Sequence, residues 1–316
     1  MTALRWSRIL RALGHRVRIE PQYRGQQCDL MIALHARRSH PSVRRFRRRY
    51  PTRPLILALT GTDLYRDLGS SRSAQRSLKL ANWLVTLQPL GIRRLPKSLR
   101  SKAMAIFQSA VCPKTSPRPR TDRFQVSVIG HLRPVKDPLR AAVAARLLPA
   151  SSRIQILHVG GALNTALAKR ARRESRSGRR YRWLGEVSHS KALRILALSR
   201  LLVLTSKLEG GANVIGEALA CGVPVLSSRI DGSVGLLGPK YPGYFAVGDS
   251  RGLARLLLRA ERDAKFLGRL RSQCKQRARY IRPERERKAW ERLLRNATRR
   301  SRSVGSTTVR IDSMAG

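Results

Sequence analysis

Residues 207–226 read Lys207-Leu208-Glu209-Gly210-Gly211-Ala212-Asn213-Val214-Ile215-Gly216-Glu217-Ala218-Leu219-Ala220-Cys221-Gly222-Val223-Pro224-Val225-Leu226. An apolar run, Leu201 to Leu204, precedes this segment, and a second apolar run, Val223 to Leu226, ends it. Short apolar runs bounded by turn residues are typical of strands that are buried on both faces of a parallel sheet. The segment therefore predicts a strand, a glycine turn, a helix closed by Gly222 and a second strand, which together form a βαβ unit.

Glu209 and Glu217 are the two carboxylates of this unit and stand eight positions apart. Glu209 precedes the predicted helix and Glu217 lies one to two turns inside it, so they cannot share a proton as a close acid/base pair. A helix that begins after Gly210-Gly211 points free backbone N–H groups at the carboxyl edge of the sheet, where open α/β sheets bind ligands. We expect an elongated ligand with an anionic middle here, held at a hydroxyl group by each glutamate. The alternative is that Glu209 complements the helix dipole and Glu217 is an ordinary helix former.

The same alternation of apolar strands and amphipathic helices runs along the chain on both sides of one proline-rich segment. The segment from Pro113 to Asp122 has three prolines and no apolar periodicity, which indicates a linker. A length of 316 residues suffices for two domains with cores of their own. The sequence thus predicts an N-terminal α/β domain at 1–112, a linker at 113–123 and a C-terminal α/β domain at 124–295. The Ser, Arg, Thr and Gly content of 296–316 predicts a disordered basic tail.

Two predicted strands of the N-terminal domain end in polar residues at the same sheet edge. His35 ends the strand that begins at Cys28, and Thr60-Gly61-Thr62-Asp63 follows the strand from Pro54 to Leu59. These groups are candidates for binding a ligand, and His35 for a general base. The alternative for His35 is a structural role, which is common for a single histidine at a strand end.

The chain is strongly basic, with 66 Lys and Arg residues against 18 Asp and Glu and a formal net charge of +48. Such a charge favours nucleic acid or acidic lipid as a partner. Arginine is spread over most predicted helices, however, and only 5% of residues are aromatic, so no basic stripe carries stacking side chains. We expect no specific nucleic-acid partner and at most a weak surface contact with acidic lipid. A non-enzymatic nucleic-acid-binding protein remains the more distant alternative.

The four cysteines, Cys28, Cys112, Cys221 and Cys274, are far apart and form no CxxC pair or metal-ligand spacing. They are typical of free thiols in a reducing compartment. No segment approaches the roughly 20 apolar residues of a transmembrane helix, and the N-terminus does not read as a signal peptide. We therefore expect a cytoplasmic protein that uses neither a metal nor a cofactor.

A second ligand-binding turn, Gly130-His131-Leu132-Arg133-Pro134-Val135-Lys136-Asp137-Pro138, follows the predicted strand 124–129. A glycine turn with Arg133 and Lys136 just before a helix places two cations where a phosphate chain would lie. The alternative for either residue alone is an ordinary surface cation, because cations are abundant in this sequence.

Together, this turn and the Glu-x7-Glu segment resemble the retaining glycosyltransferases of family four. The resemblance covers residues 124 to about 260. It implies the GT-B fold, an α/β architecture of two Rossmann-like domains that face a central cleft, and metal-independent transfer from a nucleotide-sugar donor. It also implies that Arg133 and Lys136 grip the diphosphate, Glu209 lies at the sugar and Glu217 at the ribose. His131 replaces the usual arginine, and we expect Arg133 to substitute for it.

The resemblance assigns the remaining site residues as well. The nucleotide base falls at Leu184 to Val187, and the implied donor-binding set is Gly130, His131, Arg133, Lys136, Leu184, Glu186, Gly210, Gly211, Asn213 and Glu217. The family's His-Gly turn of the N-terminal domain is replaced by residues 60–63. We expect Thr60, Gly61 and Thr62 to bind the acceptor, and Glu209, His35 and Asp63 to act in catalysis.

Five segments look like the selenosugar synthases of selenoneine biosynthesis: Ala3-Leu4-Arg5-Trp6, Ala33 to Ser39, Ala58 to Tyr65, Gly130 to Pro138 and Leu208 to Val214. That resemblance implies a UDP-sugar donor, of the UDP-N-acetylglucosamine or UDP-glucose kind, a selenophosphate acceptor and a 1-seleno-sugar product. Selenophosphate is already ionised, so such an enzyme needs charge balance more than a dedicated base. The rival within the family is a sugar or lipid acceptor in envelope glycan assembly.

The N-terminal domain lacks its first strand in this sequence, because a GT-B domain begins with a central strand and the chain begins at the helix that follows it. Without that strand, neighbouring strand edges would be buried and unpaired, at the cost of several hydrogen bonds. The sequence therefore predicts either a true start codon upstream or a defective version of the enzyme.

Overall fold

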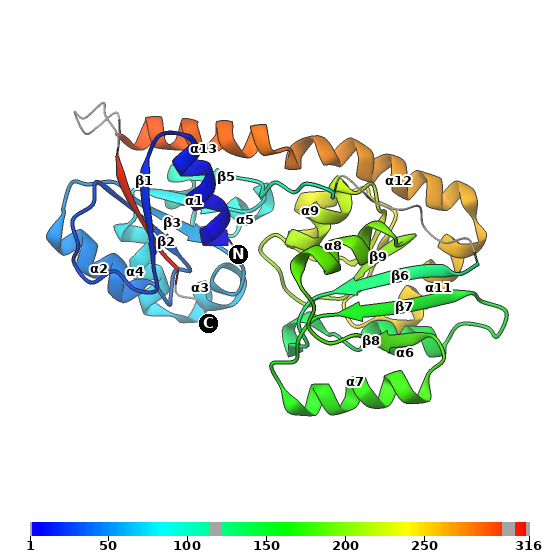
Figure 1. Ribbon diagram of the computed structural model, residues 1–316. Helices are drawn as coiled ribbons and strands as arrows, with labels where there is room; N and C mark the ends of the chain where they lie inside the picture. The colour runs from blue at the N-terminus through cyan, green and yellow to red at the C-terminus, as the bar shows by residue number, and fades with distance from the viewer. Residues whose placement is uncertain (1, 114–121, 299–306, 314–316) are drawn as a thin grey trace. The chain divides into compact units, whose positions relative to one another are not determined.

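The structure, a computed structural model, describes residues 2–113, 122–298 and 307–313. Its contacts divide the chain into two compact units. The first unit contains Met1–Gln108, Glu209–Gly211 and Pro283–Gly316, and the second contains Ser109–Leu208 and Ala212–Arg282. Among the described residues, each unit has one parallel sheet of six strands with helices packed on it (Figure 1). The two predicted Rossmann-like domains are therefore confirmed.

The sheet of the first unit has the strand order β1-β12-β2-β3-β4-β5. The strands are β1 (Arg16–Glu20), β2 (Leu30–Leu34), β3 (Leu55–Leu59), β4 (Trp83–Thr86), β5 (Ala103–Ala105) and β12 (Thr308–Asp312). The helices are α1 (Thr2–Ala12), α2 (His40–Arg49), α3 (Leu68–Ser70), α4 (Arg72–Leu80), α5 (Pro89–Arg93) and α13 (Pro283–Thr298), with a π-helical turn at Asp63–Asp67 and a 3-10 helix at Lys97–Lys102. Strands β2 and β3 match the two N-terminal strands that the sequence predicts at 28–35 and 54–59.

Two hydrophobic clusters cover the two faces of this sheet. Helices α1 and α13 pack on one face, where Trp6 and Trp290 meet edge to face with ring centroids 4.7 Å apart. Helices α2 and α4 pack on the other face. Successive residues of β2 alternate between the two clusters, as the pleat of a strand requires.

Strand β12 comes from the C-terminal end of the sequence and lies in the middle of the sheet. It pairs in parallel with β1, where Val17 is opposite Val309, and with β2, where Ile32 is opposite Ile311. Figure 1 shows this strand, in red, between the two blue ones. The edges of β1 and β2, which the sequence predicted to be unpaired, are therefore both paired with β12.

The prediction of a disordered tail at 296–316 is wrong for the described part of that range. Residues up to Thr298 continue α13, and Thr308–Asp312 form β12. The average composition hid a short alternation in which Val309 and Ile311 are buried, and two strand edges supply the hydrogen-bond partners that an isolated tail lacks.

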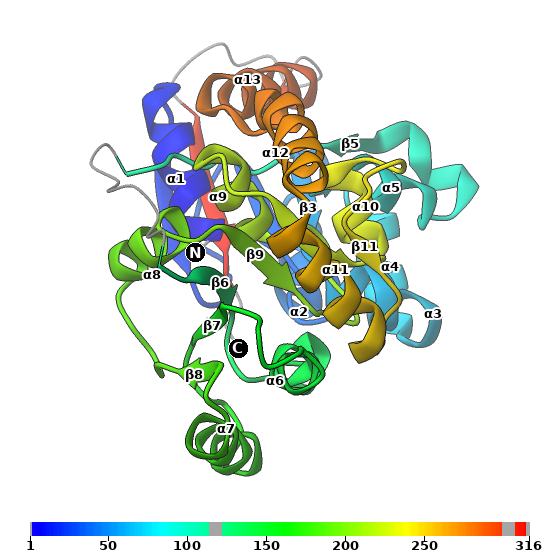
Figure 2. The ribbon, with the colours of Figure 1, turned by 90° about the vertical axis from the view of Figure 1, so that its right-hand side faces the viewer.

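The sheet of the second unit has the order β11-β10-β9-β6-β7-β8 (Figure 2). The strands are β6 (Phe124–Ile129), β7 (Ile154–Val159), β8 (Tyr181–Trp183), β9 (Leu201–Leu204), β10 (Val225–Ser228) and β11 (Tyr244–Phe245). The helices are α6 (Arg140–Arg146), α7 (Thr165–Ser177), α8 (His189–Ala197), α9 (Asn213–Ala220), α10 (Asp231–Leu237), α11 (Ser250–Arg262) and α12 (Ala264–Ala278), with a 3-10 turn at Pro134–Lys136 and another at Arg279–Ile281. The predicted βαβ unit is confirmed as β9, α9 and β10.

The domain boundaries differ from the prediction at the C-terminal side. The second unit ends at Arg282, so that α13 belongs to the first unit instead of to a domain at 124–295. Its apolar face, with Trp290, Leu293 and Leu294, completes the core under α1. Of the predicted linker 113–123, residues 114–121 lie outside the described residues.

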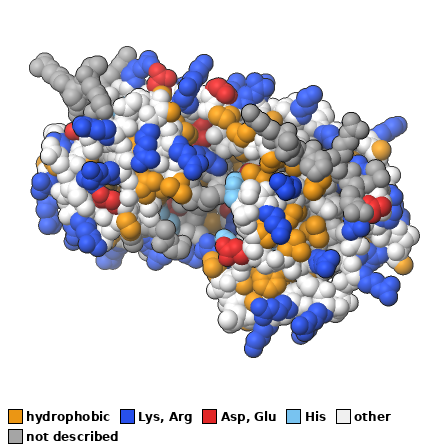
Figure 3. Space-filling view, viewed as in Figure 1, with side chains coloured by type: hydrophobic (Ala, Val, Ile, Leu, Met, Phe, Trp, Pro, Cys, Tyr) orange, Lys and Arg blue, Asp and Glu red, His pale blue; other side chains and the backbone are white. Residues whose placement is uncertain are grey.

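Charged side chains are spread over the surface. On the face seen in Figure 3, Lys and Arg side chains are scattered between apolar and polar ones and do not form one stripe. No helix within the described ranges is both long enough and apolar enough to traverse a bilayer.

Replacing Ile311 by Ala tests the place of β12. Ile311 is fully buried, so we expect the free energy of unfolding to fall by about 2–4 kcal/mol. Leu163, which is 68% exposed, is the control, and Leu163→Ala should change it by less than about 0.5 kcal/mol. Urea unfolding followed by tryptophan fluorescence measures both changes in the free energy of unfolding. Equal changes in the two variants would contradict the place of β12 in the core.

Candidate active site

The strand order of the second unit marks a ligand-binding position. From β6 the chain proceeds to β7 and β8 on one side, and then returns to β9, β10 and β11 on the other side. Ligands bind in such sheets where the order reverses, at the carboxyl ends of the central strands. Here those ends carry the Gly130 turn after β6 and the Glu-x7-Glu segment after β9.

Hydrogen bonds join these two predicted segments. The Thr205 hydroxyl, just after β9, shares its single hydrogen between the carbonyl oxygens of Lys136 and Asp137, which lie at 2.9 and 3.0 Å. The Lys207 N–H donates to the carbonyl oxygen of Val135 at 2.8 Å. The structure therefore brings the turn with Arg133 and Lys136 to the start of the glutamate segment, as the resemblance implies.

A buried histidine that the sequence reasoning missed supports the Gly130 turn. His158 of β7 is 1% exposed, and its Nε2 lies 3.1 Å from the Gly130 carbonyl oxygen, which can only accept. Its Nδ1 lies 2.8 Å from the hydroxyl of Tyr181, which must donate. Burial lowers the pKa of His158 to about 4, so the ring is neutral at pH 7. A histidine within a mainly apolar predicted strand was the sequence signal that could have revealed this support.

Close packing also fixes this turn from the side of β7. A Cβ on Gly160 would lie 2.1 Å from the Gly130 carbonyl oxygen, so only glycine fits there. The Gly161 N–H donates to His131 Nδ1 at 3.1 Å. His131 thus has a positioning contact within the turn.

The predicted base-binding loop lies beside the same edge. The Leu184 N–H donates to the His158 carbonyl oxygen at 2.8 Å, and the Leu184 side chain is partly exposed. The Glu186 carboxylate lies against Gly161, because a Cβ built there would fall 2.8 Å from its Oε2. Leu184 and Glu186 are therefore neighbours of the Gly130 turn.

Glu217 lies on α9, which begins at Asn213 after the Gly210-Gly211 pair. Its carboxylate is largely buried, and its Oε1 is 2.9 Å from Nε2 of His189, the first residue of α8. This partner was not predicted, because the two residues meet only in the folded sheet. By their contacts, Glu209, Gly210 and Gly211 belong to the first unit, whereas α9 belongs to the second.

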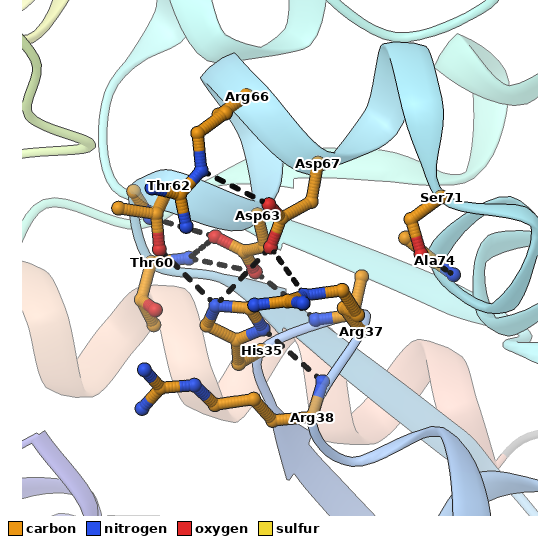
Figure 4. A network of polar contacts seen from close by, with 12 residues as sticks. His35, Arg37, Arg38, Thr60, Thr62, Asp63, Arg66, Asp67, Ser71 and Ala74 are labelled. Carbon is orange, nitrogen blue, oxygen red and sulfur yellow. Dashed lines mark hydrogen bonds and ion pairs between the residues drawn. The ribbon is translucent and has the colours of Figure 1, made fainter. Parts of the chain in front are cut away.

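In the first unit, residues after β2 and β3 form one polar network (Figure 4). His35 Nε2 lies 3.2 Å from the Thr62 hydroxyl, and His35 Nδ1 accepts the Arg38 N–H at 3.3 Å. Burial lowers the pKa of His35, and the nearby Asp63 carboxylate opposes this shift. The structure thus unites His35 with the predicted Thr60–Asp63 segment, but both ring nitrogens already have partners.

Asp63, a predicted catalytic residue, is a structural anchor of this network. Its carboxylate is fully buried and accepts the N–H groups of Thr60 (3.0 Å), Gly61 (2.8 Å) and Ala36 (3.1 Å). A carboxylate held by three backbone donors ties the two loops together.

Asp67 holds two arginine side chains in this network, an arrangement that the sequence did not predict. Its carboxylate accepts from Arg37 Nε at 2.9 Å and from Arg66 Nε at 3.2 Å, while both guanidinium groups stay largely exposed. Arg38 lies beside His35 (Figure 4). Three guanidinium groups and two carboxylates therefore surround His35, an arrangement with a net positive charge. Over the described residues, no His, Cys, Asp and Glu side chains group in threes as metal ligands would.

The family profile of the glycosyl transferases group 1 matches residues 114–280, which is more than half of the chain. The chain belongs to this family. It is therefore an enzyme, a glycosyltransferase, and the alternative of a non-enzymatic nucleic-acid-binding protein is wrong.

Solved structures similar to this glycosyltransferase share its fold. Alr3699/HepE from Anabaena, solved with UDP and glucose, has a TM-score of 0.69 at 17% identity, over 85% of this chain and 78% of that one. Sucrose-phosphate synthase from Thermosynechococcus elongatus has a TM-score of 0.71 at 18% identity, over 86% and 74%. The predicted GT-B class, with two Rossmann-like domains, is confirmed. A search of curated proteins finds no match.

Replacing His158 by Gln tests whether the buried His158 ring of this glycosyltransferase is neutral at pH 7. The pKa of His158 is about 4 in the folded state and near 6.5 when unfolded, so the unfolded chain takes up the proton first. The resulting loss of stability begins as the pH falls below 6.5 and grows until about pH 4.

Urea unfolding between pH 7 and pH 4.5 measures this effect. We expect the wild type to lose up to about 1.4 kcal/mol per pH unit more than His158→Gln, whose amide can still donate to Gly130. Parallel profiles for the two proteins would contradict a neutral, buried His158.

Proposed function

We propose that this enzyme transfers a sugar from a UDP-sugar, of the UDP-N-acetylglucosamine or UDP-glucose kind, to selenophosphate. The observation that carries the donor half is the shared hydrogen bond from Thr205 to the Lys136–Asp137 backbone, which holds the cationic turn beside the glutamate segment. A related fold solved with UDP-glucose supports the choice of donor.

The donor roles follow from chemistry and position. Arg133 and Lys136 neutralise the diphosphate as it leaves, and the N-terminus of α9 at Asn213, after Gly210-Gly211, adds backbone donors. Glu217 holds the ribose hydroxyl groups, with His189 fixing the direction of its carboxylate. Glu209 lies at the sugar, and the backbone of residues 184–187 holds the base.

The acceptor binds at the edge of the first unit. Thr60, Gly61 and Thr62 supply polar groups, and Arg37, Arg38 and Arg66 supply the positive charge that a small polyanion requires. Selenium attacks the anomeric carbon, a carbon–selenium bond forms, and the carbon–oxygen bond to the diphosphate breaks to release UDP. The nucleophile arrives ionised, so His35 needs to act only as a hydrogen-bonding group.

Incubation of the purified enzyme with each UDP-sugar and selenophosphate tests the proposal. We expect UDP release that depends on selenophosphate, together with a selenium-containing sugar detected by mass spectrometry. UDP release only with a sugar or lipid acceptor would reject selenophosphate and favour the rival role in envelope glycan assembly.

Two substitutions test the donor site in the same assay. Lys136→Ala and Glu209→Ala should each lower kcat/KM for the donor about 100-fold, because each removes a group aimed at developing charge. Lys265→Ala, which removes an exposed cation of α12, is the control and should change it less than about twofold. Unchanged turnover in both site variants would remove the donor-site assignment.

A further inference from the structure

The last residue of β12, Asp312, is a buried carboxylate at the same sheet edge as His35. It is 1% exposed, and its Oδ1 lies 3.0 Å from the hydroxyl of Ser39, while its Oδ2 accepts the Tyr23 N–H at 3.4 Å. A carboxylate removed from water is costly unless its partners are fixed. Asp312 therefore holds two segments that are far away in the sequence.

Ser39 ends the short turn that begins at His35. Its N–H donates to the His35 carbonyl oxygen at 3.0 Å, and its hydroxyl lies 2.8 Å from the Leu34 carbonyl oxygen as well as near Asp312. Asp312 thus contacts the hydroxyl that closes the turn carrying Arg37 and Arg38.

The turn is strained and is held from two sides. His35 has φ of +87°, in the left-handed region that residues other than glycine rarely adopt. Such a conformation persists only where the surroundings fix it, and it is common at ligand-binding sites. Asp63 holds one side through the Ala36 N–H, and Asp312 holds the other through Ser39.

We propose that Asp312 is a positioning residue for the acceptor. It keeps the His35–Ser39 turn in its strained form, so that His35 reaches Thr62 and the Arg37 and Arg38 guanidinium groups point to the acceptor. This inference rests on the proposed function, in which that edge binds selenophosphate. Strand β12 then does more than fill the sheet, because its carboxyl end helps to shape the site.

The matched control is Asp29, which contacts the opposite end of β12. The Asp29 carboxylate accepts the Thr308 N–H at 2.8 Å, and Asp29 is only half-buried. Asp29→Ala therefore removes a carboxylate that also anchors β12, but at the amino edge of the sheet, away from His35. Any general loosening of β12 affects both variants, whereas a positioning effect is confined to Asp312→Ala.

Two measurements on the full chain test the proposal. In steady-state kinetics, Asp312→Ala should raise KM for selenophosphate about tenfold, the scale of one lost buried hydrogen bond, with KM for the UDP-sugar changed less than about twofold. Asp312→Asn, which can still accept from Ser39, should recover most of this loss. In hydrogen exchange without ligand, the amides of residues 35–39 should exchange faster in Asp312→Ala than in the wild type or Asp29→Ala.

The outcomes separate this inference from the proposed function. Unchanged exchange at residues 35–39, or an equal change in Asp29→Ala, would overturn the positioning role of Asp312, as would an unchanged KM for selenophosphate. If the wild type does not use selenophosphate, the proposed function fails, and the exchange comparison alone still decides whether Asp312 holds the turn.

Discussion

The backbone pairing of β12 with β1 and β2 is the interaction on which the first unit depends. A strand in the middle of a parallel sheet satisfies the N–H and C=O groups of both neighbours, and each buried group left unpaired costs about 1–3 kcal/mol. Val309 and Ile311 join the core under α1 and α13, while Asp312 reaches the turn at His35. One strand thus supplies hydrogen bonds, apolar packing and a polar anchor.

In the second unit the comparable constraint is the reversal of strand order at β6 and β9. It forces the Gly130 turn and the Glu209–Glu217 segment to the same edge, and Thr205 then joins them. The neutral ring of His158, on β7, supports the turn through its hydrogen bond to the Gly130 carbonyl oxygen. In the proposed function, a cationic turn on such a rigid base loses little energy in reorganisation when the diphosphate leaves, which is how preorganised charge accelerates transfer.

The sequence predicted what local patterns determine. Periodicity located most helices and strands, and the Gly130 turn and the Glu-x7-Glu segment lie at the same edge of the second sheet. Contacts between distant residues could not be predicted this way. Strand β12 was assigned to a disordered tail because its partners lie almost a full chain length away, and the pairs His189–Glu217 and Ser39–Asp312 exist only after folding. The hydrogen bond from the Ala36 N–H to Asp63 likewise joins two loops that come together only in the folded chain.

Native-state hydrogen exchange of the β12 amides tests the central claim most directly. If β12 is a central strand, the amides of Val309 to Ile311 open only with the whole unit, and their opening free energy approaches that of global unfolding. Exchange of these amides at the rate of an unstructured peptide would contradict the account, because the sheet of the first unit would then be held together without its middle strand.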